Sequence, residues 1–388
     1  MSAPSIPIRL AFCSAAVFAV TGIHLPFWPV WLAAQGITPE GIGLLVALGY
    51  FTRLIAAPGF SYLADVVGDR RAPLIWLAIC HFFALGAFWF AGSFGAIAAV
   101  TILAAGSYTA IIPLKESLTM GWVMAKGYDY GRIRLWGSLS FIVMSVTGGF
   151  LLSPFGPDAI LVIMMALTAL LAISGFTLPH DPRKGEHGTR SKVTLRAVGA
   201  LMREPSFLLF ILSASAVMAS HAIYYAFGTI NWQRLEYSNE FIGALWGLGV
   251  LAEIVLFAVS AAFVRKLTPP MMLLIGALAA IVRWTLTAFS PHWAILVLLQ
   301  CLHAATFGAT HLGVMHYIAR AVPSELAATA QGIFGAMGGG VVMGLVMLSA
   351  GSLYGEFEAF AYVPMAGLGV IGFIAALLLE RRWRARPI

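Results

Sequence analysis

The chain has 388 residues, of which 60% are hydrophobic and only 10% are charged, and its formal net charge is +7. A soluble globular domain carries roughly 25% charged residues, so this composition excludes a soluble enzyme, a disordered chain and a small disulfide scaffold. Apolar stretches run from end to end, and about 20 apolar residues cross a bilayer, so the sequence predicts a polytopic membrane protein.

Charges, prolines and clusters of Gly, Asn and Asp divide the sequence into twelve apolar segments, each predicted to be a spanning helix. Arg9 and the apolar run after it imitate a secretory signal, but eleven further segments favour retention of the first one as a helix. The predicted limits are 9–33, 40–63, 72–91, 94–121, 133–152, 158–178, 206–229, 240–263, 271–290, 293–318, 327–350 and 361–380. The predicted fold class is an all-α membrane protein with twelve transmembrane helices.

The distribution of positive charge predicts the orientation. When the loops are assigned alternately to the two sides, 19 of the 23 Lys and Arg fall on one side; the others are Arg53, Lys115, Arg234 and Arg283. The positive-inside rule then places both termini in the cytoplasm. The net charge therefore reflects topology, and no nucleic-acid partner is expected.

The longest polar stretch, residues 180–205, separates six segments from six and contains six cations. It predicts a solvated cytoplasmic linker near anionic lipid. We expect one six-helix bundle over residues 1–179 and a second over residues 206–388.

The two halves share a repeated segment. With a shift of 200 residues, 38–49 aligns with 238–249, and Glu, Ile, Gly, Leu, Leu and Gly coincide. Thr38 and Ser238 are expected to cap the two helices, with Glu40 and Glu240 in the first turns, where the helix dipole favours an anion. Chance similarity between apolar stretches is the alternative, but repeated halves are typical of transporters built from parallel repeats.

Ionisable side chains inside the predicted spans cost about 2.5–3.5 kcal/mol each, so we expect them to be paired or to line a wet cavity. Arg53 and Glu253 lie at equivalent depths of spans 2 and 8, and Arg283 is in the middle of span 9. Glu253 and Arg283 are the favoured buried pair. The pair either orders the bundle as a fixed salt bridge or contains a carboxylate whose protonation depends on engagement of the arginine.

Span 4 carries the adjacent residues Lys115 and Glu116. Neighbours on a helix point about 100° apart, so we expect them to face different directions, with one contacting Arg132 or Arg134. A simple salt bridge at the cytoplasmic mouth is the alternative.

Histidines and aromatic residues provide further candidates. His303 and His311 lie two turns apart in span 10 and could relay protons, although a hydrogen-bonded helix contact is the alternative for each. His24 and His221 fall in spans 1 and 7, with Trp28 and Tyr225 placed to stack on a ligand. For the tryptophans of these spans, interfacial anchoring is the alternative.

No nucleotide-binding or metal-binding motif is present. The sequence has no Gly-x-x-x-x-Gly-Lys-Ser/Thr, Cys-x-x-Cys or His-Glu-x-x-His, and Cys13, Cys80 and Cys301 lie in apolar runs. We therefore expect no metal and no cofactor.

The loop after span 2 reads Ser61-Tyr-Leu-Ala-Asp65-Val-Val-Gly68-Asp69-Arg70-Arg71. It is similar to the Gly-x-Leu-Ala-Asp-x-x-Gly-Arg-Arg/Lys signature of the major facilitator superfamily. Asp65, Gly68 and Arg70 or Arg71 match that signature, whereas Ser61 replaces its first glycine and Asp69 interrupts its basic end. The resemblance implies that these matching residues shape a cytoplasmic gate.

Further stretches resemble the phenylpropionate permease group, which is related to lactose permease-like and nucleoside–proton symporters. They are Gly22-x-x-x-Pro26-Phe27-Trp28-Pro29-x-Trp31-Leu32-x-x-x-Gly36, Arg53 ahead of Pro58, Tyr130-Gly-Arg132-Ile-Arg134-Leu-Trp136-Gly137-Ser138 and Leu302-His303-Ala-x-Thr306-Phe307-Gly308.

This resemblance implies a monomer in a bacterial inner membrane that takes up a small organic solute, such as an aromatic carboxylate, together with protons. The expected proton-coupling residues are Glu253, Arg283 and His303. The expected substrate cavity, between spans 1, 2, 4, 5 and spans 7, 8, 10, 11, includes His24, Trp28, Arg53, His221, Tyr225, Glu116, Arg134 and His311.

Three other functions remain as alternatives. Proton-coupled efflux of an amphipathic compound would use the same cycle in the opposite direction. A membrane enzyme acting on lipid would need a catalytic cluster near one face, and the short outer loops offer none, so no enzymatic activity is expected. A sensor would signal through the central loop, which is too short to form a domain.

Overall fold

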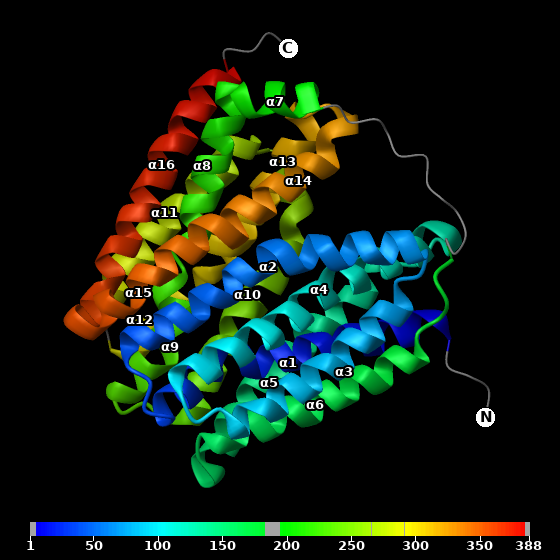
Figure 1. Cartoon of the computed structure of the whole chain (residues 1–388). Helices are drawn as coiled ribbons and strands as arrows, with labels where there is room; N and C mark the ends of the chain where they lie inside the picture. The colour runs from blue at the N-terminus through cyan, green and yellow to red at the C-terminus, as the bar shows by residue number, and fades with distance from the viewer. Residues whose placement is uncertain (1–4, 183–194, 265, 291, 385–388) are drawn as a thin grey trace. The chain divides into compact units, whose positions relative to one another are not determined.

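The computed structural model describes residues 5–182, 195–264, 266–290 and 292–384, and these residues form helices joined by short turns, with no strand among them (Figure 1). The chain divides into two compact units. Unit 1 comprises Met1–Gly188 and Trp232–Gly247, and unit 2 comprises Thr189–Asn231 and Leu248–Ile388.

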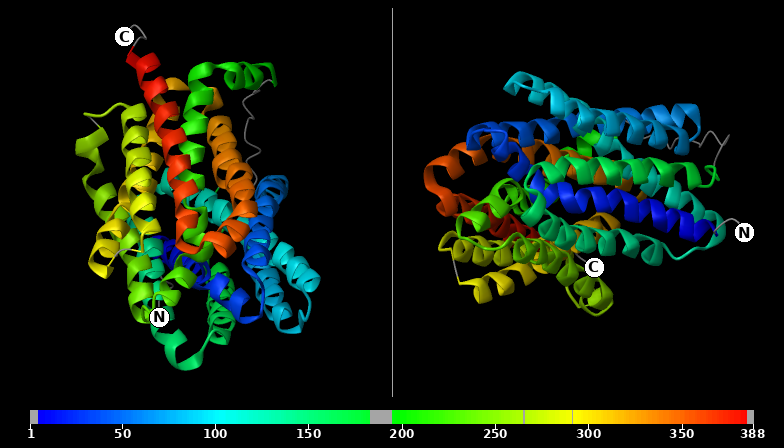
Figure 2. Two further views of the ribbon diagram at one scale, coloured as in Figure 1. Left: turned by 90° about the vertical axis from the view of Figure 1, so that its left-hand side faces the viewer. Right: turned by 90° about the horizontal axis from the view of Figure 1, so that it is seen from below.

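Unit 1 is built around α1, which packs against both α5 and α6, while α3 packs against α4 and α6, and α2 packs against α4 (Figures 1 and 2). Its helices are α1 (Ile6–Ala34), α2 (Pro39–Val67), α3 (Arg71–Ala87), the 3-10 turn η1 (Phe88–Phe90), α4 (Phe94–Lys126), α5 (Tyr130–Phe155) and α6 (Asp158–Thr177). The end of α9 and the start of α10 also belong to this unit.

Unit 2 places α8, α11 and α16 side by side, in green, yellow and red in the left view of Figure 2. Its helices are α7 (Leu195–Arg203), α8 (Pro205–Ala219), α9 (Ala222–Arg234), α10 (Asn239–Val264), α11 (Pro269–Ala288), α12 (Trp293–Cys301), η2 (Ala304–Ala309), α13 (Thr310–Ala321), η3 (Ser324–Leu326), α14 (Ala327–Ala336), η4 (Met337–Val342), α15 (Met343–Phe357), η5 (Glu358–Ala361) and α16 (Tyr362–Arg384).

The predicted fold class is confirmed. Among the described residues, eleven helical runs are long and apolar enough to cross a membrane, and the longest, Ser324–Trp383, contains the last two predicted segments. Three predicted spans are less regular than expected. Span 7 is interrupted at residues 220–221, between α8 and α9, and spans 10 and 11 each contain a π-helical segment, η2 and η4.

Part of the predicted linker is a packed helix. Residues 183–194 lie outside the described residues, but α7 forms over the end of the stretch and lies beside the start of α8 (Figure 1). Leu201 packs into the core of unit 2, and Ala197 and Val198 lie against that core. Apolar residues at this spacing share one helix face, so one face of this segment packs on unit 2 while Arg196 and Arg203 are exposed. A cytoplasmic position of the linker stays a prediction.

The predicted helix caps of the repeated segment are confirmed. The Thr38 hydroxyl accepts a hydrogen bond from the Gly41 N–H at 3.3 Å, and the Ser238 hydroxyl accepts one from the Phe241 N–H at 3.3 Å. Each cap satisfies one of the free N–H groups at the start of α2 or α10. The two copies of the repeat therefore share this capping hydrogen bond as well as their sequence.

The turns before these caps also match. Gly36 and Glu236, 200 residues apart, both have left-handed backbones, with φ of 76° and 63°. In both turns the next N–H, of Ile37 or Tyr237, bonds the carbonyl five residues earlier, at 3.2 and 3.1 Å. This is the hydrogen bond of a Schellman motif, so the same device ends α1 and α9.

Candidate functional site

A fully buried guanidinium group lies at the centre of unit 2. Arg283, on α11, donates from Nη2 to Gln300 Oε1 at 3.0 Å, and from Nη1 to Thr306 Oγ1 and His303 Nδ1, both at 3.2 Å. Its Nε has no hydrogen-bond partner among the described residues. Three residues of span 10 therefore hold the arginine in one orientation.

The hydrogen bond between Arg283 and His303 determines the tautomer of the imidazole. A guanidinium group can only donate, so His303 Nδ1 accepts, and a neutral ring carries its proton on Nε2. That nitrogen lies 3.9 Å from Oε2 of Glu253, on α10. His303 thus stands between the arginine and the carboxylate and contacts both.

This arrangement corrects one expectation. A direct buried salt bridge between Arg283 and Glu253 was predicted, but no carboxylate pairs with Arg283 among the residues that the structure describes. Spans 8 and 9 are neighbours in sequence, yet the histidine of span 10 lies between their charges. The three predicted proton-coupling residues are brought together, in the order Arg283, His303, Glu253.

Aromatic rings surround the arginine. The Tyr224 and Trp284 rings lie 4.7 and 4.5 Å from its Cζ, which is cation–π distance. The Tyr224 hydroxyl also donates to Gln300 Oε1 at 3.1 Å. Gln300 was not among the predicted site residues, although an amide three positions before His303 in an apolar run is a usable signal.

A second histidine completes the network. His221 Nε2 lies 3.0 Å from Thr306 Oγ1, while its Nδ1 lies 3.1 Å from the Val217 carbonyl, to which it donates. His221 lies in the break between α8 and α9, and the Tyr225 ring stacks on it with ring centres 5.5 Å apart. Two of the predicted cavity residues therefore belong to the same cluster as Arg283.

Local backbone features position span 10. The π-helical segment η2 begins directly after His303, and such segments are frequent at functional sites. A Cβ on Gly308, inside this segment, would lie 2.8 Å from Leu256 Cδ2 and 3.6 Å from Glu253 Cγ. The glycine thus allows span 10 to approach α10 closely enough for His303 to reach Glu253.

A carboxylate is the hub of a second cluster, in unit 1. Glu116 accepts hydrogen bonds from Lys115 Nζ at 2.6 Å and from the Tyr130 hydroxyl at 2.9 Å, and Arg134 Nε lies 3.7 Å away. The predicted contact with Arg134 is confirmed, whereas Arg132 is highly exposed and pairs with Asp129. Tyr130 was not predicted as a partner.

The expectation that Lys115 and Glu116 face different directions is wrong. The Cβ directions differ, but the long lysine side chain bends back to its neighbour and also donates to Ser14 Oγ at 3.3 Å. Lys115 is 2% exposed, so pairing offsets the cost of burying its charge. Lys115 Nζ and Arg134 Cζ lie 5.2 and 4.0 Å from the centre of the Phe18 ring.

The predicted gate residues meet at the opposite end of unit 1 from the caps of the repeat. Arg70 bridges Asp65, at 2.5 Å, and Asp181, at 2.8 Å. Asp181, which was not predicted, has a fully buried side chain, whereas the Asp65 side chain is 54% exposed. Gly68 ends α2 in the left-handed conformation, and Arg71 donates to the Phe176 carbonyl at 2.7 Å.

The remaining predicted cavity residues are dispersed. In unit 1, His24 stacks on Trp28 with ring centres 5.9 Å apart, and Arg53 is exposed. In unit 2, His311 lies near the rings of Phe257 and Phe307. A cavity shared by all of these residues stays a prediction.

Comparisons with known proteins agree with this architecture. The sequence model of the MFS_1 like family matches residues 8–363. The chain is 32% identical over 356 residues to a protein of Escherichia coli (strain K12) named "Probable 3-phenylpropionic acid transporter", covering 89% of this chain and 92% of that protein. It is 26% identical over 385 residues to a maltose permease of Geobacillus stearothermophilus, covering 95% and 93%. Among solved structures, the nucleoside transporter NupG superposes with a TM-score of 0.84 at 18% identity, covering 97% of this chain and 99% of that one.

Proposed function

Because the chain belongs to the MFS_1 like family and is an integral membrane transporter of that type, we propose that it moves a small aromatic carboxylate in symport with protons. The named relatives carry an aromatic acid, a disaccharide and a nucleoside, so family membership leaves the substrate open. The choice of an aromatic carboxylate rests on the chemistry of the site in unit 2.

One observation carries this proposal: the Arg283 charge is fully buried and has no carboxylate partner among the described residues. An uncompensated charge in a protein interior is costly, so the site favours an anionic ligand. The planar guanidinium group suits a carboxylate, which can accept two parallel hydrogen bonds. The Tyr224 and Tyr225 rings provide faces for an aromatic group beside it.

The His303 tautomer supports the proposed coupling to protons. Nδ1 cannot hold a proton while it accepts the hydrogen bond from Arg283. A substrate carboxylate that engages Arg283 would release Nδ1, and a proton taken up there would be stabilised by Glu253 on the other side of the ring. In this scheme His303 and Glu253 form one coupled proton site, and substrate arrival promotes proton uptake.

The cluster around Glu116 is proposed to contact the substrate from unit 1. Lys115 and Arg134 give it one positive charge more than Glu116 balances. His24, Trp28 and Arg53 of unit 1, and His221, Tyr225 and His311 of unit 2, are proposed to line the same cavity. Asp65, Gly68, Arg70 and Arg71 are proposed to control its cytoplasmic gate.

The proposed cycle is alternating access between six-helix bundles over residues 1–179 and 206–388, joined by a linker over 180–205. The distribution of Lys and Arg supports a cytoplasmic position for both termini. We place the protein in a bacterial inner membrane as a monomer that works in the direction of uptake.

Reconstitution into liposomes tests the proposal. An imposed pH gradient, acidic outside, should drive accumulation of radiolabelled 3-phenylpropionate faster than in protein-free liposomes, where only the neutral acid crosses the bilayer, and a protonophore should abolish it. The matched neutral compound, 3-phenylpropionamide, should neither accumulate nor compete. Equal competition by the amide, or accumulation that ignores the pH gradient, would contradict the proposal.

A further inference from the structure

A pocket of about 380 Å³ lies where α1 ends, at the end of unit 1 opposite to the gate residues. Its walls are the end of α1, the η1 turn with the two residues after it, and the start of α6. The lining residues are Trp31, Gln35, Phe88, Trp89, Phe90, Ala91, Gly92 and Asp158. Roughly 300–1,000 Å³ is the usual volume of a small-molecule site, so the pocket can hold a group of several heavy atoms.

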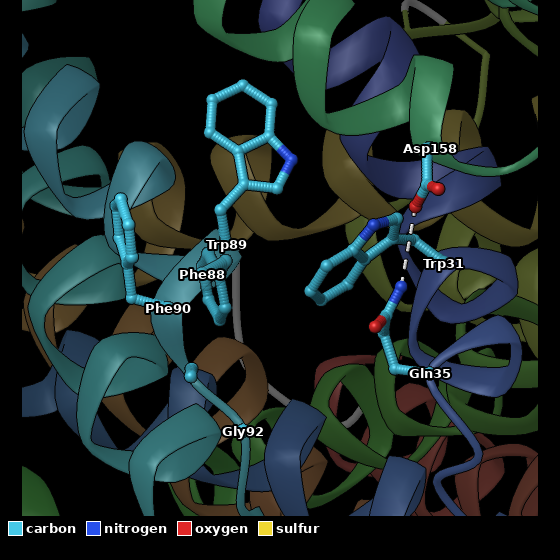
Figure 3. Close-up of a pocket in the computed structure, with 8 residues that line it drawn as sticks. Trp31, Gln35, Phe88, Trp89, Phe90, Gly92 and Asp158 are labelled. Atoms are coloured by element: carbon cyan, nitrogen blue, oxygen red, sulfur yellow. Dashed lines mark hydrogen bonds between the residues drawn. The ribbon is translucent and has the colours of Figure 1, made fainter.

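The walls combine aromatic rings with one negative charge. Figure 3 shows the Trp31 indole between the aromatic side chains of η1 and the pair formed by Gln35 and Asp158. The Trp31 and Phe88 ring centres are 5.5 Å apart at 70°, so a face and an edge meet there. Aromatic rings beside a carboxylate form the kind of site that attracts an organic cation.

The charge in this pocket is not neutralised. Asp158 accepts one hydrogen bond, from Gln35 Nε2 at 3.4 Å, and no cation pairs with it among the described residues. Asp158 also lies in the first turn of α6, where the helix dipole favours a negative charge. A cationic ligand would therefore find a fixed negative charge.

The pocket also offers an unused donor. The indole N–H of Trp31 is buried and has no acceptor among the described residues, although buried donors are nearly always hydrogen-bonded. A ligand with an oxygen atom close to its cationic group would supply that acceptor. Ethanolamine and choline groups have this composition, with a hydroxyl or phosphate oxygen two carbons from the nitrogen.

We infer that this pocket binds an ammonium group, separately from the transport site. Two sources have this chemistry: the head group of a phospholipid and a free organic cation. The pocket lies where spanning helices end, and Trp89 and Phe90 beside it are 54% and 89% exposed. Tryptophan and other aromatic residues at that level contact lipid head groups, so a head group is within reach of the pocket.

The first test uses choline and 3,3-dimethylbutan-1-ol, its uncharged isostere, with the purified full-length chain. Equilibrium dialysis should show saturable binding of radiolabelled choline, and the isostere should compete at least roughly tenfold less well. Equal competition by the isostere would overturn the proposal without the need for any variant.

A matched pair of variants locates the site. Asp158→Asn keeps the shape of the side chain and an acceptor for Gln35, and it should weaken choline binding roughly five- to tenfold. Glu40→Gln is the control, because Glu40 is an acid in the first turn of α2 that does not line the pocket. Unchanged binding in Asp158→Asn, or an equal loss in Glu40→Gln, would overturn the assignment.

A lipid arm separates the two sources. Native mass spectrometry would follow lipids retained from nanodiscs containing equal amounts of phosphatidylethanolamine and phosphatidylglycerol. Retention of phosphatidylethanolamine that choline displaces and Asp158→Asn lacks would identify the head group as the ligand. Choline binding without such retention would identify a free organic cation as the ligand. The absence of both choline binding and lipid retention would contradict the inference.

Discussion

The hydrogen bond from Arg283 Nη1 to His303 Nδ1, 3.2 Å long, exists only while that nitrogen is unprotonated, because a guanidinium group has no acceptor. Proton uptake at Nδ1 and engagement of the arginine by the histidine therefore exclude one another. In the proposed cycle, His303 is therefore the residue that links binding of an anionic substrate at Arg283 to uptake of a proton.

Replacing the carboxylate tests the proton site. Glu253→Gln should abolish accumulation of 3-phenylpropionate driven by a pH gradient, since an amide cannot change its charge. Exchange of labelled for unlabelled substrate should persist, because the amide resembles the protonated acid. Glu240→Gln, in the first turn of the same helix, is the control and should accumulate substrate normally. Loss of exchange in Glu253→Gln would instead indicate a purely structural carboxylate.

Two substitutions of His303 separate its two nitrogens. In His303→Asn the amide oxygen can take the place of Nδ1 and keep the hydrogen bond from Arg283, so the melting temperature should stay close to that of the wild type. His303→Gln places its amide nearer to Glu253 and leaves one of the two Arg283 Nη1 hydrogens without an acceptor, which costs about 1–3 kcal/mol. Both variants should lose pH-driven accumulation. Greater stability of the glutamine variant would contradict the assigned tautomer.

Arg283→Lys tests the anion site. Lysine keeps the positive charge but cannot present the planar set of donors that bonds Gln300, Thr306 and His303 at once. We expect the affinity for 3-phenylpropionate, measured by isothermal titration calorimetry, to fall at least tenfold, or about 1.4 kcal/mol. A variant that binds the acid as tightly as the wild type would show that point charge alone is sufficient.

The two partners of Arg70 should differ in their contributions to stability. Asp181→Asn weakens a buried ion pair, and breaking such a pair costs about 3–5 kcal/mol. Asp65→Asn removes a half-exposed partner and should cost only about 0–1 kcal/mol. Thermal unfolding in detergent would rank the two variants. If Asp65 acts in the gate, Asp65→Asn should slow transport more than it weakens substrate binding.

Glu236 is expected to destabilise its own turn. Its left-handed backbone costs a non-glycine residue about 1–2 kcal/mol, and the equivalent position of the repeat is Gly36. Glu236→Gly should therefore raise the melting temperature, while Gly36→Ala should lower it. Opposite signs for the two changes would support the matched Schellman motifs, and a fall in both would contradict them.

Sequence patterns were sufficient to predict the spanning helices, the two helix caps and most of the charged residues that form clusters in the structure. Apolar length sets the spans, and Thr38 and Ser238 cap helices through contacts only three residues away. Gln300, Tyr130 and Asp181 were missed because their roles depend on contacts with Arg283, Glu116 and Arg70 in other helices or loops. A local pattern can mark a polar residue such as Gln300 in an apolar run, but it does not identify the partner in another helix.

The irregular backbone segments were not predicted from the sequence either. The break at His221 and the two π-helical segments lie in runs without proline. The three glycines of η4 weaken the helix there, but they do not specify a π-helical turn. The Lys115–Glu116 contact depends on how a flexible side chain satisfies its charge after burial, and backbone geometry alone gave the wrong answer.

The π-helical segment after His303 has a consequence for chain length. A π turn accommodates one residue more than an α turn, so deletion of a single residue within Ala304–Ala309 could restore an uninterrupted α-helix without moving either end of the span. The deletion would leave His303 and α13 in place and would change only the residues inside the segment, among them Thr306, which accepts a hydrogen bond from Arg283. Span 10 is thus a place where an indel, normally disruptive inside a membrane helix, would be absorbed by the backbone and would act on the charge network instead.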